Sequence, residues 1–145
     1  MDYTLRKAKD SDLDYLLQLR RLTMDDYLSQ DGVDISDEEH VFRIKFNFAD
    51  AKIILVNGVE AGLFKASYTA SNSQWYIYQV QIHPSYQGFG IGRKLIFNLC
   101  QQALRDNLSV GLSVLKSNPA KSLYERLGFT VTDSNNSEFE MAYNT

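Results

Sequence analysis

The spacing of apolar and polar residues predicts two helices in the first third of the chain. Apolar side chains recur at three- and four-residue steps over residues 13–28, which is typical of an amphipathic helix with one face on a core. Ser36 and Glu39 have the spacing of a capping box and predict the start of a second helix, which continues to about Phe48. A short strand over residues 3–8 precedes both helices.

The middle of the chain has the pattern of three consecutive antiparallel strands. Residues 52–56 and 59–69 are rich in β-branched and aromatic side chains, and the Asn-Gly pair at 57–58 suits the positive φ angles of a tight hairpin turn. A third such run follows over residues 75–82 and ends before Pro84, because proline cannot donate to a sheet ladder.

The last third of the chain predicts alternating helices and strands. The expected elements are a helix, a strand, a short helix and a closing hairpin, over residues 91–103, 110–115, 119–127, and 129–132 paired with 138–143. The complete order, βααβββαβαββ, predicts a mixed α/β fold with a twisted sheet and helices on both faces. With 145 residues the chain has the length of one domain, so we expect a single domain over residues 1–145.

Composition and charge exclude several classes of protein. Apolar residues make up 44% of the chain and charged residues 23%, as in soluble globular proteins, so a buried core can form. The net charge of −3 lacks the basic excess of nucleic-acid binding proteins, so we expect no nucleic-acid partner. Because apolar runs are short and the start is acidic, we expect a cytoplasmic protein with no membrane partner. The single cysteine, Cys100, allows neither an internal disulfide nor a multi-cysteine zinc site, and we expect no metal.

A glycine-rich turn lies between the predicted strand 75–82 and the helix that follows it. Residues 87–92 read Gln-Gly-Phe-Gly-Ile-Gly, and glycines let backbone N–H groups approach a ligand while the helix start supplies free donors. This chemistry suits a pyrophosphate, and Arg93 and Lys94 could add positive charge. A P-loop is excluded because Gly-Lys-Ser/Thr is absent, and a dinucleotide fold because three antiparallel strands come first. The alternative is a turn that closes tightly without a ligand.

A second cluster, over residues 118–129, reads Asn-Pro-Ala-Lys-Ser-Leu-Tyr-Glu-Arg-Leu-Gly-Phe. It places Tyr124 in a short helix directly after the strand that follows the glycine-turn helix, so the tyrosine and the turn should lie near one another. Together the two segments resemble the GCN5-related N-acetyltransferase (GNAT) superfamily, whose signatures are Q/R-x-x-G-x-G/A and N-x-x-A-x-x-L-Y-x-x-x-G-F. The alanine of the second signature, Ala120, comes one residue early here. The order of elements resembles the family over residues 3–143.

The resemblance implies an N-acetyltransferase that moves acetyl from acetyl-coenzyme A to a primary amine of a small molecule or protein. It also implies a GNAT-like sheet of about seven strands with four helices, whose fourth and fifth strands splay apart so that pantetheine inserts between them. The glycine turn would hold the pyrophosphate, Asn118 would contact the pantetheine arm, and Tyr124 would act as the general acid that protonates the departing thiolate. A tyrosine with an ordinary pKa near 10 can do this without a strong shift. The implied cofactor-binding residues are Val80, Ile82, Gln87, Gly88, Phe89, Gly90, Ile91, Gly92, Arg93 and Asn118.

The base that would deprotonate the amine does not follow from the sequence. Many relatives carry a glutamate on the fourth strand, whereas Gln79 and Gln81 stand here, and amides cannot act as bases at neutral pH. A water chain with backbone carbonyls, a carboxylate from the first two helices, or an amine that binds neutral could replace it. We expect a structural role for His83, a solvated His40 and a core position for Cys100.

The acceptor is left open by the sequence. Residues 25–39 hold seven acidic side chains and no basic one, which indicates either a solvated face or a negative rim that concentrates a cationic amine. The candidate acceptor-binding residues are Asp25, Asp26, Tyr27, Gln79 and Gln81. Arg20 and Arg21 could instead bind the carboxylate of an amino-acid-like acceptor. Aminoglycoside, polyamine, small-amine and protein acceptors all fit, and a homodimer is one possible assembly. The alternative to an enzyme is an acyl-coenzyme A binding or regulatory module with little transferase activity.

Overall fold

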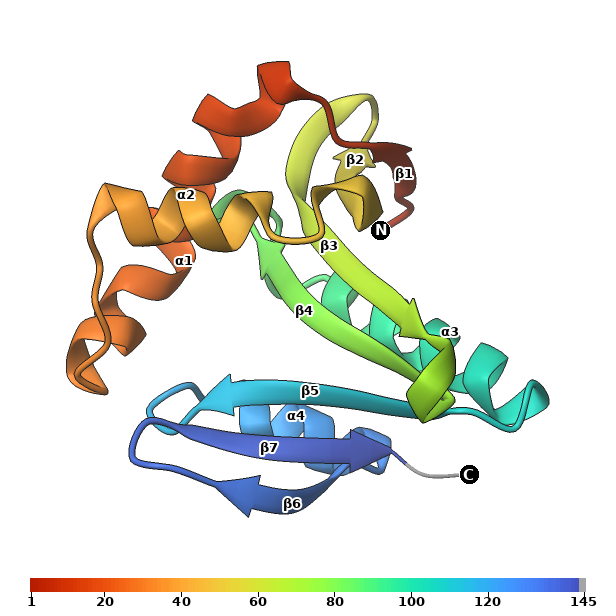
Figure 1. Cartoon of the computed structure of the whole chain (residues 1–145). Coiled ribbons are helices and arrows are strands. Elements are labelled where there is room, and N and C mark those ends of the chain that lie inside the picture. Colours follow the sequence, from red (N-terminus) through yellow and green to blue (C-terminus); the bar gives the residue numbers. More distant parts are fainter. Residues whose placement is uncertain (144–145) are drawn as a thin grey trace.

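Seven strands form one mixed sheet in the computed structural model, which describes residues 1–143 (Figure 1). The helices are α1 (Leu13–Gln30), α2 (Asp37–Lys45), α3 (Ile91–Arg105) and α4 (Ala120–Leu127). The strands are β1 (Thr4–Lys7), β2 (Ala51–Val56), β3 (Val59–Thr69), β4 (Gln74–Ile82), β5 (Ser109–Leu115), β6 (Thr130–Ser134) and β7 (Glu138–Tyr143). This is the predicted order βααβββαβαββ, so the mixed α/β fold is confirmed.

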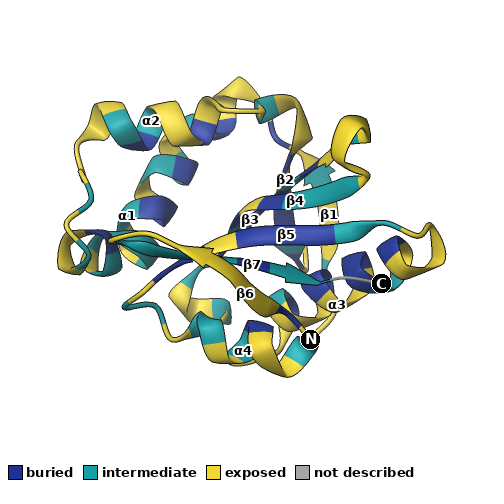
Figure 2. Cartoon of the chain, turned by 60° about the horizontal axis from the view of Figure 1, so that its bottom comes forward, coloured by how far each residue is buried: buried dark blue, intermediate teal, exposed yellow. Residues whose placement is uncertain are grey.

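The sheet separates two layers of helices. Its strand order is β1-β2-β3-β4-β5-β7-β6, in which β4 and β5 run parallel and the other neighbours run antiparallel. Helices α1 and α2 cover one face and α3 and α4 the other (Figure 2). Each face has its own core, with Leu19, Ile44 and Leu63 buried beneath α1 and α2, and Ile96 and Met141 buried beneath α3 and α4. None of the helices in the described part of the chain is long and apolar enough to cross a membrane.

Helix α2 ends at Lys45, earlier than its sequence pattern predicts. The cause is Lys65 of β3, which is fully buried. Its Nζ donates to the carbonyl oxygens of Arg43 at 3.0 Å, of Ile44 at 2.9 Å, and of Phe46. A helix leaves its last carbonyls without partners, so this side chain ends α2 and ties its last turn to the sheet. Burial lowers the pKa of Lys65 to about 8.

Strands β4 and β5 separate halfway along their length. They pair only as far as Ile77 and Leu112, and the gap between them then widens (Figure 1). A β-bulge lies at this point, because the pairing of β3 with β4 passes from Gln79 to Ile77 and leaves Tyr78 without a partner. A bulge bends its strand, so the last part of β4 turns away from β5. The splayed strands that the GNAT resemblance implies are therefore present.

Candidate active site

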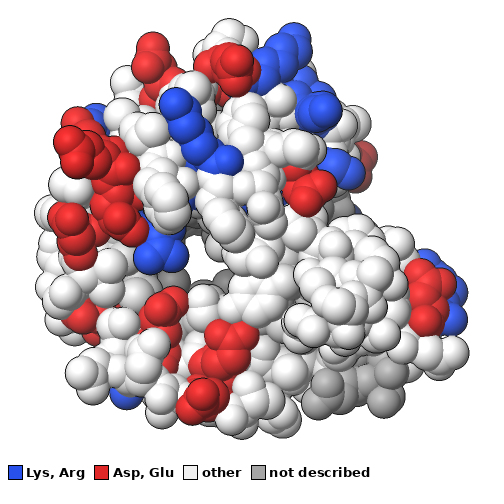
Figure 3. Space-filling view, in the orientation of Figure 1, with Lys and Arg blue, Asp and Glu red and all other residues white. Residues whose placement is uncertain are grey.

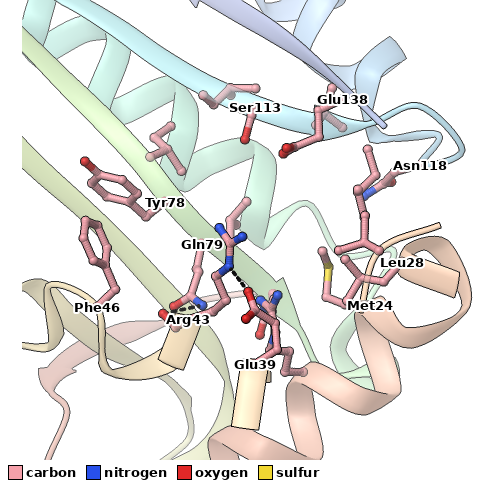
Figure 4. A pocket seen from close by; sticks show the side chains of 18 of the residues that line it. Met24, Leu28, Glu39, Arg43, Phe46, Tyr78, Gln79, Ser113, Asn118 and Glu138 are labelled. Carbon is pink, nitrogen blue, oxygen red and sulfur yellow. Dashed lines mark hydrogen bonds and ion pairs between the residues drawn. The ribbon is translucent and has the colours of Figure 1, made fainter. Parts of the chain in front are cut away.

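A cavity of about 340 Å³ fills the space between the separated strands and the first two helices (Figure 4). Helices α1 and α2 contribute Arg20, Met24, Leu28, Glu39, Phe42 and Arg43 to its wall. Strands β4 and β5 contribute residues 77–81 and 112–115, and Val33, Phe46, Asn118, Tyr124 and Glu138 complete it. Of the two clusters that the sequence marks out as functional, the second lines this cavity through Asn118 and Tyr124, whereas the glycine turn at 87–92 lies outside its wall, beyond the end of β4.

The glycine turn has a backbone that other residues adopt only at a cost. Gly88 and Gly90 have φ angles of +84° and +80°, in the left-handed region. The side chain of Gln87 donates to the carbonyl oxygen of Ile82 at 2.9 Å, which ties the turn to the end of β4. Phe89 is 54% exposed, so its side chain extends from the protein surface at this turn.

The start of α3 leaves backbone donors free. Its first hydrogen bond runs from the N–H of Lys94 to the carbonyl of Gly90 at 3.0 Å. The N–H groups without a helical partner are those of Ile91, Gly92 and Arg93. A Cβ on Gly92 would lie 3.8 Å from the side chain of Ile82 and 3.9 Å from that of Val80. The start of α3 therefore packs on the part of β4 that does not pair with β5. Free donors at a helix N-terminus next to a free strand edge fit a phosphate attached to a long amide-bearing arm.

Tyr124 projects from α4 into the cavity. It is buried against Phe129, with the ring centroids 6.0 Å apart, and its hydroxyl makes no hydrogen bond within residues 1–143. Burial raises the pKa of Tyr124 to about 12, which corrects the expectation of an ordinary value near 10. The hydroxyl is therefore protonated throughout the neutral range. Asn118 lies two residues before α4, and its Oδ1 accepts from the N–H of Ala120 at 2.9 Å, which leaves the Asn118 side-chain NH₂ group available to a ligand.

Two glutamines of β4 present unused acceptor atoms to the cavity. Gln79 is 7% exposed and Gln81 4%, and their Oε1 atoms are buried without a hydrogen-bond partner in the described residues. The Nε2 of Gln79 donates to the carbonyl oxygen of Arg43 at 3.3 Å, so the orientation of its amide is fixed and its Oε1 is the free atom. An unpaired buried acceptor is costly, so this wall favours a ligand that carries N–H groups.

Most carboxylates of the acidic segment, residues 25–39, are bound within the protein. Their partners are His40 for Asp25, Ser117 for Asp31, Ser36 for Asp34, Arg21 for Asp37 and Arg43 for Glu39. Figure 3 shows acidic side chains gathered on the side of α1 and α2, and both basic and acidic side chains at the edge of the central hollow. Asp25, Asp26 and Tyr27 are not among the residues that line the cavity, whereas Glu39 is.

The expectation that His40 is solvated is wrong. His40 is fully buried, its Nδ1 accepts from the Nε of Arg20 at 2.9 Å, and its Nε2 lies 2.7 Å from an oxygen of Asp25. Because Nδ1 accepts a hydrogen bond, the ring proton is on Nε2, and this N–H donates a hydrogen bond to Asp25. The two other expectations hold, since His83 accepts from the N–H of Ser85 at a strand end and Cys100 is buried.

Sequence reasoning missed several residues of the cavity wall. Glu138 enters from β7, and Phe42 and Arg43 from α2. The only sequence signal for Glu138 is its place at the start of a strand expected beside a buried one. Nothing in the pattern of α2 distinguishes Arg43 from the other charged residues of a solvated helix face.

Comparison with known proteins identifies the family. A family model described as the acetyltransferase (GNAT) domain matches residues 43–142, which is more than half of the chain. The chain therefore belongs to the GNAT acetyltransferase family.

Two relatives match shorter segments. A stretch of 57 residues is 42% identical to the L-methionine sulfoximine/L-methionine sulfone acetyltransferase of Salmonella typhimurium and covers 38% of this chain and 33% of that protein. Another of 61 residues is 38% identical to the [ribosomal protein bS18]-alanine N-acetyltransferase of Haemophilus influenzae and covers 39% of this chain and 40% of that protein. The matched segments span less than half of the length of either relative.

A solved structure is similar over the whole chain. The PaiA N-acetyltransferase from Thermoplasma acidophilum, solved in complex with coenzyme A, superimposes with a TM-score of 0.72 at 19% identity, with 100% of both chains covered. At this identity the similarity shows a shared fold.

Proposed function

We propose that this chain is a single-domain N-acetyltransferase that moves acetyl from acetyl-coenzyme A to a primary amine of a small molecule or protein. The observation that carries the proposal is a series of features along β4. Free N–H groups lie at the start of α3, an unpaired strand edge follows beyond Ile77, and the edge leads to the cavity that holds Tyr124. Membership of the GNAT family supports the same activity. One relative is named as an acetyltransferase of L-methionine sulfoximine and L-methionine sulfone, and the other as an acetyltransferase of an alanine of ribosomal protein bS18. Small-molecule and protein acceptors therefore both fit.

Acetyl-coenzyme A supplies the activated acetyl group, and this chain offers it three kinds of contact. The N–H groups at the start of α3 would hold the pyrophosphate, with the charge of Arg93 beside them. The backbone of Val80 and Ile82, on the edge that β5 leaves free, would bond the pantetheine arm. The NH₂ group of Asn118 would donate to a carbonyl of the same arm.

Transfer needs one proton to be removed and one to be delivered. The neutral amine attacks the thioester carbon, the C–N bond forms, the C–S bond breaks, and the sulfur leaves as a thiolate. Tyr124 would protonate this sulfur, because it lines the cavity and its hydroxyl keeps its proton at neutral pH. The proton lost by the nitrogen must pass to a base.

Glu138 is the carboxylate in the cavity wall that is free to accept that proton. Glu39, the other wall carboxylate, is bound by the Nε of Arg43 at 2.8 Å. Glu138 has no ion pair within residues 1–143, and its side chain points into the cavity (Figure 4). It would take the proton of the amine directly or through water.

Replacing Glu138 with glutamine should lower kcat/KM at pH 7 about 100-fold or more. The loss should shrink as the pH rises toward the pKa of the amine, because more acceptor then binds as the neutral amine and no base is needed to remove the proton of its ammonium form. Glu60→Gln, on an exposed position of β3, is the matched control and should leave the profile unchanged. A loss in Glu138→Gln that is constant from pH 7 to pH 9.5 would exclude the role of a base.

The activity is tested by thiol release. The protein is incubated with acetyl-coenzyme A and a panel of amines, and free thiol is followed with a chromogenic reagent against a reaction without acceptor. We expect release that depends on the acceptor. Tight coenzyme A binding without release for any amine would favour the binding or regulatory module, which the amides at positions 79 and 81 make the second candidate.

A further inference from the structure

Arg20 is a buried cation with unused donors at the cavity. It is only 7% exposed and lines the cavity from α1. Its Nε donates to Nδ1 of His40, and Nε2 of the same ring is hydrogen-bonded to Asp25. The two terminal nitrogens of Arg20 make no hydrogen bond within residues 1–143. A guanidinium has five N–H donors in a planar fork that fits a carboxylate. The Asp25–His40 pair therefore fixes the orientation of a fork whose open end faces the cavity.

The carboxylates around Arg20 all have hydrogen-bond partners of their own. The charge of Arg43 acts on Arg20, and the charge of Arg20 acts on Lys65. Burial, together with the charge of Arg43, lowers the pKa of Arg20 to about 10. Asp25 and Glu39 act on Arg20 and Asp50 acts on Lys65, but Asp25 bonds to His40, Glu39 to Arg43 and Asp50 to Ser67. The terminal N–H groups of Arg20 therefore donate to no carboxylate within residues 1–143, which favours an anionic ligand there.

An acceptor for N–H groups lies in the same cavity. The free Oε1 of Gln79 is on β4, against which α1 packs, and the amide of Gln79 is held by the backbone of Arg43. Gln79 and Arg20 thus offer a hydrogen-bond acceptor and a carboxylate fork from neighbouring elements. A molecule with an amine and a carboxylate close together satisfies both.

The wall also has an apolar part, whereas Gln81, Ser113, Asn118 and Glu138 make the rest of it polar. Met24 and Leu28 of α1, Phe42 of α2, and the edge-to-face pair of Phe46 and Tyr78, whose centroids are 5.1 Å apart, surround the space beside Arg20. These side chains have no polar group that could recognise a second charge on the acceptor except the Tyr78 hydroxyl. They fit an aliphatic or aromatic side chain of moderate size.

We infer that the acceptor is a free α-amino acid with an apolar side chain, whose carboxylate binds Arg20 and whose amine faces Gln79. The inference rests on the proposed acetyl transfer and names its acceptor class. A peptide N-terminus has an amide in place of this carboxylate, so it would leave the free N–H donors of Arg20 without a charged acceptor.

The test compares three acceptors of nearly equal shape: L-leucine, L-leucinamide, which stands for a peptide N-terminus, and 3-methylbutan-1-amine. We expect kcat/KM for L-leucine to exceed that for L-leucinamide at least about tenfold at pH 8. The amine of the amide loses its proton more easily, so intrinsic reactivity favours the opposite order. A rate for the amide or the simple amine that equals or exceeds that for L-leucine would overturn the inference and leave the proposed transfer standing.

Variants connect the preference to Arg20. In Arg20→Met the ratio of L-leucine to L-leucinamide should fall to near one, and Arg20→Lys should keep part of it. Arg21→Met is the matched control, because Arg21 is the next residue of α1, is paired with Asp37 and is not part of the cavity wall, so the ratio should stay at the wild-type value. An unchanged ratio in a folded Arg20→Met would contradict the assignment. The wild-type comparison decides the acceptor class even if the Arg20 variants do not fold.

Equilibrium binding separates a failure of this inference from a failure of the proposed function. Calorimetry measures L-leucine binding to the protein saturated with coenzyme A. If no amine releases thiol but L-leucine binds and L-leucinamide does not, the carboxylate site stands and the transferase proposal fails. If L-leucine neither binds nor is acetylated, the inference is wrong.

Discussion

Replacing Tyr124 with phenylalanine should slow acetyl transfer about 100-fold or more at saturating substrates, because the departing thiolate loses its proton donor. The ring remains to pack on Phe129, so the melting temperature and the affinity for coenzyme A should change little. Single-turnover measurement of thiol release gives the rate, and calorimetry gives the affinity. Tyr68→Phe, on an exposed position of β3, is the control. A normal rate in a folded Tyr124→Phe would mean that water protonates the sulfur.

The pH profile tests the same hydroxyl. Because burial raises the pKa of Tyr124 to about 12, the proton-bearing form should persist through the whole range from pH 7 to pH 10. A tyrosine with the ordinary value of 10 would be half ionised at the upper end of this range. The wild-type rate should therefore rise with the deprotonation of the acceptor and show no descending limb below pH 10. A descending limb that disappears in Tyr124→Phe would show that the hydroxyl ionises earlier.

Replacing Gly90 with valine should weaken coenzyme A binding about tenfold or more. No protein atom lies within 4 Å of a Cβ at this position, so the side chain fits the fold but stands in front of the free N–H groups of α3. Calorimetry on the folded variant measures the loss. Gly58→Val is the matched control, because Gly58 has nearly the same φ, +79° against +80°, and equally open surroundings but lies in the β2–β3 turn. Both variants carry the same backbone strain, and only Gly90→Val should lose affinity.

The local structure of this chain could be predicted because local signals agree with one another. The Asn-Gly turn at 57–58, the cap of α2 at Ser36 and the glycine turn each combine a backbone requirement with the residue that satisfies it. The glycine turn was indicated by its place between a strand and a helix, and the role of Tyr124 by the resemblance to the GNAT family. That the two segments should lie near one another follows from the order of strands, since β4 and β5 are neighbours in the sheet.

The acceptor side could not be predicted, because it depends on contacts between side chains far apart in sequence. Arg20 and His40 are twenty residues apart, and the burial of His40 follows from how α1 and α2 pack, which helical periodicity does not encode. The acidic segment illustrates the same difficulty. Its charge is visible in the sequence, but whether a carboxylate is free depends on whether a partner such as Ser117 is brought to it.

The bulge at Tyr78 determines which side chains of the last part of β4 face each side of the sheet, and both substrates would contact this part of the strand. Trp75 and Ile77 face α3, and after the extra residue Val80 and Ile82 face α3 again, so Gln79 is turned toward α2. A regular strand with the same residues would continue the alternation unbroken, so Gln79 and Gln81 would point into the apolar layer while Val80 faced the acceptor. Deleting Tyr78 itself would keep the faces of Gln79 and Val80, because Ile77 and Gln79 already oppose consecutive residues of β3. What such a deletion would remove is the bend of β4, and with it the separation from β5 that makes room for both substrates.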